Sequence, residues 1–243
     1  MKKQLITLIV MLILAPLACR AHSVWIETSS VGQLGKQQTV SVYFGEFGKD
    51  KREKVGNRFT EVNGFTAWAV SPSGKQTFLK FTPKTNCYQA IFTPSENGTY
   101  VILLENKVRE VADWRNTSGK LGIIKQNYYA RATVQVGDQV HVSQKAFTDL
   151  LVSSVHDPGA KSEVVFLATF QGKPLQATTL VVRAPGMQEI KLTTDEQGKV
   201  SWAGARPGLY TVTALLRFET PGTYKGVFYE AIREKATFTF HLM

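Results

Sequence analysis

His22 is the residue whose type and position most directly suggest chemistry. If an export peptidase cuts after Ala21, His22 becomes the first residue and carries a free α-amine beside its imidazole. These two nitrogens can chelate one metal ion, and neutral nitrogen ligands suit copper, nickel and zinc. The competing interpretation is that His22 is simply the first polar residue of a strand over 23–27.

The N-terminal segment has the pattern of an export signal. Basic residues at 2–3 precede an almost wholly apolar run over 5–14, and the small residues Cys19 and Ala21 stand at positions −3 and −1 of the cleavage site. We therefore expect residues 1–21 to be removed and the mature protein to be periplasmic.

Lipidation at Cys19 is the alternative form of processing. Pro16 stands where lipoprotein signals usually carry an aliphatic residue, which makes Cys19 the weaker prediction. The apolar run is also shorter than the roughly 20 residues that a spanning helix needs. We expect no membrane span in the mature chain.

A metal site needs further ligands, and the mature chain holds three more histidines, His141, His156 and His241. No two histidines have the close spacing of a local metal motif, so the fold must assemble any site. We expect His22 to be joined by His156 and Asp157. His141 is the next candidate, and His241 is the weakest. The expected ligand is a divalent transition metal: nickel, cobalt, copper or zinc.

Catalysis is not expected. A second histidine facing the His22 amine would give a copper centre like that of oxidative polysaccharide-cleaving enzymes, but sequence cannot show such a partner. Paired carboxylates could hydrolyse a glycoside, but scattered acids are ordinary in solvated loops: the available ones are Glu27, Glu46, Glu61 and Glu105. Motifs for a serine nucleophile elbow, a phosphate-binding loop and a zinc protease are absent.

The formal charge of the 243-residue chain is +10, and removal of a signal with three basic residues and no acid leaves +7. This balance favours solubility and anionic partners. The basic residues are spread along the whole chain without an arginine-rich helix, so nucleic acid is not an expected partner.

Residues 22–157 show short alternating segments separated by turns, which predicts an N-terminal β-sandwich domain. Strands are expected over 39–44, 65–70 and 76–81, and a Pro- and Gly-containing turn makes the last two neighbours. A second strand–turn–strand unit, with Asn-Gly at its turn, is expected over 88–105.

Two stretches interrupt this pattern. Residues 45–58 are rich in glycine and charge and predict a long solvated loop, with a charged lip over a binding site as the alternative. Residues 106–126 carry mixed charge, Trp114 and two glycines, and the pattern does not assign them to an element.

The C-terminal half, 158–243, gives the clearest fold signal. Asp-Pro-Gly at 157–159 breaks the pattern and sets the domain boundary. Strands over 164–170 and 179–183, with glycine-containing turns between later ones and a last strand over 236–240, predict an Ig-like sandwich of seven strands. It is similar to transthyretin or the collagen-adhesin repeat.

Five motifs together resemble the DUF4198 family of bacterial periplasmic proteins. They are Ala21-His22 with Trp25, the strand over 129–134, the turn over 172–175, the hairpin over 194–199 and the aromatic strand over 236–240. The resemblance implies two tandem β-sandwich domains in an all-β protein.

The resemblance also implies a component of nickel or cobalt uptake. The expected partners are a metal ion or metal complex and an envelope transporter or receptor. Family members often carry further histidines near the mature start, and none stands between His22 and His141 here. The alternative function is a non-catalytic structural or protein-interaction module of the cell envelope.

Overall fold

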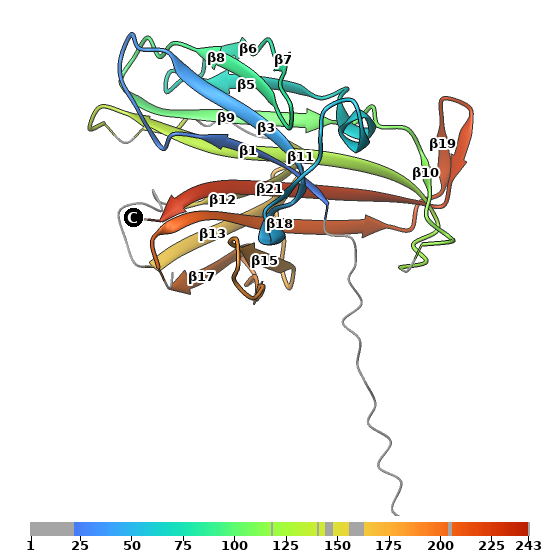
Figure 1. The fold of residues 1–243 in the computed structure, drawn as a ribbon. Coiled ribbons are helices and arrows are strands. Elements are labelled where there is room, and N and C mark those ends of the chain that lie inside the picture. The colour runs from blue at the N-terminus through green and yellow to red at the C-terminus, as the bar shows by residue number, and fades with distance from the viewer. Residues whose placement is uncertain are drawn as a thin grey trace, which may run out of the picture.

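The computed structural model describes residues 22–117, 119–139, 141–143, 148–155, 163–203 and 206–242. In these ranges the chain is built of strands, with two short 3-10 helices, η1 (Phe47–Lys49) and η2 (Arg58–Val62), and no α-helix (Figure 1). The expected all-β sandwich class is confirmed. No helix in the described part of the chain is long and apolar enough to cross a membrane.

A ten-stranded sheet runs through both halves of the chain. Its strands are β2 (Val31–Gly32), β5 (Thr66–Val70), β6 (Gln76–Phe78), β9 (Gly98–Asn106), β10 (Ala112–Asp113), β11 (Ile123–Val136), β15 (Thr179–Arg183), β16 (Ile190–Thr193), β18 (Gly208–Phe218) and β21 (Ala231–Leu242). Their order is β16–β15–β18–β21–β11–β9–β5–β6, with β2 and β10 paired to β11.

Two smaller sheets complete the sandwiches. The five-stranded sheet contains β1 (Ser23–Thr28), β3 (Gln38–Glu46), β4 (Lys51–Arg52), β7 (Thr82–Pro83) and β8 (Tyr88–Phe92). The four-stranded sheet contains β12 (Leu150–Ser154), β13 (Glu163–Phe170), β14 (Lys173–Pro174) and β17 (Lys199–Ala203). A separate hairpin is formed by β19 (Gly222–Tyr224) and β20 (Val227–Tyr229).

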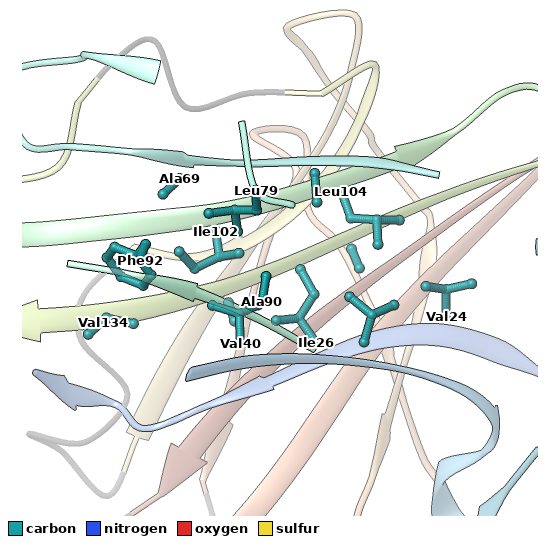
Figure 2. Close-up of a cluster of buried hydrophobic side chains, with 14 of the residues drawn as sticks. Val24, Ile26, Val40, Ala69, Leu79, Ala90, Phe92, Ile102, Leu104 and Val134 are labelled. Carbon is teal, nitrogen blue, oxygen red and sulfur yellow. The ribbon is translucent and has the colours of Figure 1, made fainter. Parts of the chain in front are cut away.

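Two hydrophobic cores lie on opposite faces of the ten-stranded sheet, because side chains alternate along each strand. On β11, Tyr128 packs in the core beneath the five-stranded sheet, whereas its neighbour Tyr129 packs in the core beneath the four-stranded sheet. Figure 2 shows part of the first core, in which Ile26 of β1 and Ile102 of β9 share one cluster. The molecule is thus two sandwiches that share a sheet.

The predicted division of the chain at residue 157 falls within 156–162, which lie outside the described residues. The position of the boundary stays a prediction. The sheet itself is continuous across the two halves, because β21 of the second half pairs with β11 of the first.

The predicted hairpin over 65–81 is confirmed, since β5 and β6 pair antiparallel with Trp68 opposite Phe78. The unit over 88–105 contains the two expected strands, but β8 and β9 do not pair with each other. They belong to different sheets and send Phe92 and Tyr100 into the same core from opposite layers. The Asn-Gly turn therefore crosses the sandwich.

Gly45 is the point where β1, β3 and β4 meet. It pairs with Ser23 of β1 on one side and with Arg52 of β4 on the other. Its φ is +153°, and a Cβ at this position would overlap the carbonyl oxygen of Lys51. Only glycine allows β4 to approach β3 this closely, and β4 carries the chain toward Glu53.

Gly45→Ala is expected to lower the free energy of unfolding by about 1–3 kcal/mol more than Gly56→Ala, because the overlap with Lys51 forces a backbone shift. Gly56 is a matched control in the same loop: its φ is also positive, at +84°, but nothing lies within 4 Å of its Cβ position. Urea denaturation of both variants measures the difference. Equal losses of stability in the two variants would show that the fold does not require the close approach of β4 to β3.

Candidate functional site

Three segments far apart in the sequence converge at His22. The pairing of Ser23 with Gly45 brings His22 against the loop over 45–58. The backbone carbonyl of His22 accepts a hydrogen bond from Lys235 Nζ at 2.8 Å, which ties it to β21. His22 is only 7% exposed, and its ring packs 5.3 Å from that of Phe44. The first residue after the predicted cleavage site is therefore a fixed part of the fold.

Two groups contact His22 Nε2. Glu53 Oε1 lies 2.6 Å away and Arg58 Nη1 lies 3.1 Å away. If Nε2 carried no hydrogen, its lone pair would oppose the carboxylate oxygen of Glu53, so we assign the hydrogen to Nε2 as a donor to Glu53. The Arg58 guanidinium then lies beside the Glu53 carboxylate, with Nη1 3.8 Å from Oε1.

In the neutral ring, this assignment leaves His22 Nδ1 with a lone pair. Nδ1 is buried and has no hydrogen-bond partner among the described residues, which begin at His22. The closest carboxylate oxygen to it is Oε1 of Glu46, 3.7 Å away. A histidine whose one nitrogen is held by a carboxylate while the other is bare has the arrangement of a metal ligand with its outer carboxylate.

Both carboxylates are held in the charged form. The pKa of Glu53 is lowered from its ordinary 4.5 mainly by the hydrogen bond from His22, although burial opposes this. The pKa of Glu46 is lowered mainly by its hydrogen bond to Lys49, which lies 2.7 Å away. His22 thus sits between two carboxylates at the end of β1.

A cavity of about 90 Å³ opens beside His22. The cationic side chains on its wall are Arg58, Arg109, Arg233 and Lys235, and the one carboxylate among the lining residues is Glu61. Its aromatic and aliphatic lining comes from Phe44, Trp114, Leu121 and Tyr128. The cavity is large enough for several water molecules or one small organic molecule.

The two stretches that interrupted the strand pattern build this end of the molecule. Residues 45–58 supply Glu46, Glu53 and Arg58 to the surroundings of His22. The stretch over 106–126 supplies Arg109 and Trp114 to the cavity. The sequence did not identify these residues as ligands, although the interruption of alternation marked both stretches.

The other predicted ligands are not brought to His22 in the described part of the chain. His141 is exposed, and its carbonyl accepts a hydrogen bond from Thr99. Thr99 pairs with Gln135, which pairs in turn with Val31, three residues beyond the end of β1 that is opposite His22. The six residues of β1 separate these ends by roughly 20 Å. His156 and Asp157 lie outside the described residues. Among the described residues, no group of three or more His, Cys, Asp or Glu side chains is placed to hold a metal.

Glu53→Gln is expected to lower the free energy of unfolding at neutral pH by about 1.5–3 kcal/mol, the range for a hydrogen bond to a charged group. Because the pKa of Glu53 is lowered in the fold, its contribution is complete above 4.5 and is lost as the pH falls through the lowered value. Urea denaturation at several pH values should therefore show the two proteins converging in acid.

Glu110→Gln is the control, because Glu110 is exposed and its carboxylate forms an ion pair with Lys225 at 2.8 Å on the protein surface. It should change stability little at any of these pH values. If Glu53→Gln lost as much stability at pH 3 as at neutral pH, the assigned hydrogen bond from His22 to the charged Glu53 carboxylate would be contradicted.

Comparison with known proteins places the chain in a family whose function is not described. No curated protein matches it. The family model called "Domain of unknown function (DUF4198)" matches residues 19–217, which include His22, the loop over 45–58 and most of both sandwiches. On this match, the chain belongs to the DUF4198 family.

Proposed function

We propose that the processed protein binds a divalent transition metal at its new N-terminus and serves in the periplasm as an accessory to metal uptake. The observation that carries the proposal is the buried Nδ1 of His22, which lies 3.7 Å from Glu46 Oε1 and finds no hydrogen-bond partner in the part of the chain that the structure describes. A buried nitrogen without a partner is costly unless a ligand uses it.

Cleavage after Ala21 would complete the ligand set. The α-amine of His22 and its Nδ1 belong to one residue, so they can close a chelate ring on one metal ion. Glu46 is the nearest carboxylate to Nδ1 and would supply an oxygen. Two nitrogens and one oxygen suit nickel, cobalt, copper and zinc.

Glu53 has a different part in this proposal. It holds Nε2 at 2.6 Å, which fixes the orientation of the ring and makes Nδ1 a better electron donor. The proposed role is binding and not catalysis. The periplasmic location rests on the export-signal pattern of 1–21, and the uptake role, with an envelope transporter or receptor as partner, rests on what the family resemblance implies.

The test is calorimetric titration of the exported, metal-free protein, with mass spectrometry to verify that it starts at His22. Nickel, cobalt, copper and zinc are titrated separately. We expect a Kd of about 1 μM or tighter for at least one of them, and loss of that binding in His22→Ala.

Two further variants separate the α-amine from the imidazole. A protein with one glycine added before His22 keeps the imidazole but moves the free amine away, and should lose at least about tenfold in affinity, or about 1.4 kcal/mol. His141→Ala removes an exposed histidine at the other end of β1 and should bind as the wild type does. Equal binding by all four proteins, or no binding by any, would contradict a metal site at His22. It would favour the alternative function, a partner-binding module of the cell envelope.

A further inference from the structure

Arg109 carries a buried guanidinium nitrogen for which the described part of the chain provides no hydrogen-bond acceptor. The residue is 8% exposed and lines the cavity beside His22. Its Nη2 donates to Glu61 Oε2 at 2.6 Å, whereas its Nη1 is buried without a hydrogen-bond partner. A buried charged donor left unpaired costs more than a neutral one, so an acceptor from a bound molecule would stabilise Nη1.

The guanidinium groups of Arg109 and Arg233 both lie close to the ring of Trp114. The guanidinium carbon of Arg109 lies 5.3 Å from the centroid of Trp114, and that of Arg233 lies 5.5 Å from the same centroid. Each contact with the ring is favourable, but two like charges gathered at one indole repel each other. An anion bound beside Trp114 would relieve this repulsion.

The cavity lining holds more cationic side chains than carboxylates. Glu61 accepts from Arg58 at 3.1 Å and from Arg109 at 2.6 Å, so one carboxylate serves two guanidinium groups. Arg233 and Lys235 add further positive charge to the same wall. Because a guanidinium presents a planar fork of donors, it matches the two oxygens of a carboxylate.

The rest of the wall is apolar. Tyr128 and Trp114 each present a ring, and Phe44 and Leu121 extend the apolar surface. Such a wall favours an anion with a carbon body over a fully hydrated inorganic ion, since it gains from burial of apolar area. The volume of about 90 Å³ limits that body to a small one.

We propose that this cavity is a binding site for a small organic carboxylate, with Arg109 as its principal donor and Trp114 as its wall. The carboxylate would take the free Nη1 of Arg109 and lie beside Arg233. The site depends on the guanidinium groups and not on the metal proposed at His22, although the two sites are adjacent because His22 also lines the cavity.

The test is calorimetric titration of metal-free exported protein with benzoate and with succinate. The metal is removed by a chelating resin, because soluble chelators are themselves carboxylates. Benzamide, which keeps the ring and lacks the charge, is the matched control ligand. We expect at least one carboxylate to bind with a Kd of about 1 mM or tighter, and benzamide to bind at least about tenfold more weakly.

Arg109→Gln should weaken carboxylate binding by tenfold or more. Arg115→Gln removes the same charge from an exposed residue that pairs with Asp113 outside the cavity lining, and should leave binding unchanged. If Arg109→Gln does not fold, Arg233→Gln tests the same wall with a less buried residue, and it should also weaken binding.

The outcomes separate this proposal from the metal site. Carboxylate binding that survives in His22→Ala supports the cavity whether or not a metal binds. Binding of benzamide equal to benzoate, binding of inorganic phosphate in preference to both carboxylates, or carboxylate binding that requires added nickel would each overturn the proposal.

Discussion

The parallel pairing of β11 with β21 is the contact on which the rest of the structure depends. It runs from Ile124 opposite Ala231 to Ala132 opposite Thr239 and joins two sandwiches into one sheet. Parallel neighbours cannot be linked by a tight turn and need a crossover connection. Here the crossover is the remainder of the second sandwich. The pairing places Lys235 beneath His22, 213 residues away in the sequence.

Polar side chains near the beginnings of β11 and β21 lie on both faces of the ten-stranded sheet, and those on the face of Tyr129 form a buried network. Tyr129 donates to Glu234 Oε2 at 2.9 Å and Asn127 donates to Oε1 at 3.0 Å, while burial raises the pKa of Glu234. Burial also lowers the pKa of Lys125 to about 8. Further along, from Tyr128 on one face and Ala236 on the other, both strands enter the hydrophobic cores. On the opposite face of the same two strands, Gln126, Tyr128, Arg233 and Lys235 line the cavity.

The sequence predicted those parts of the molecule that local patterns determine. Alternation and a Pro-Gly turn were enough for β5 and β6, because the two strands are adjacent in both sequence and space. The Asn-Gly turn before β9 was not enough, because whether two strands pair or face each other across a core depends on the partners that each finds elsewhere. The strand pairs of β11 were beyond prediction for the same reason.

In the candidate site, too, the sequence could predict one residue and could not predict others. His22 could be predicted because the signal pattern sets it at the start of the mature chain. Glu53 and Arg109 could not, since each lies in an irregular segment and meets its partner 31 or 48 residues away in the sequence. An aperiodic, charged stretch inside an alternating pattern was the one available sign of them.

The proposed metal site depends on which nitrogen of the His22 ring carries the hydrogen. Long-range nitrogen–proton NMR of the mature, isotope-labelled protein reports which ring nitrogen carries the hydrogen. We expect a hydrogen on Nε2, held by Glu53, and a bare Nδ1 whose resonance moves when zinc is added. A hydrogen found on Nδ1, or an Nδ1 resonance that zinc leaves unchanged, would contradict this expectation.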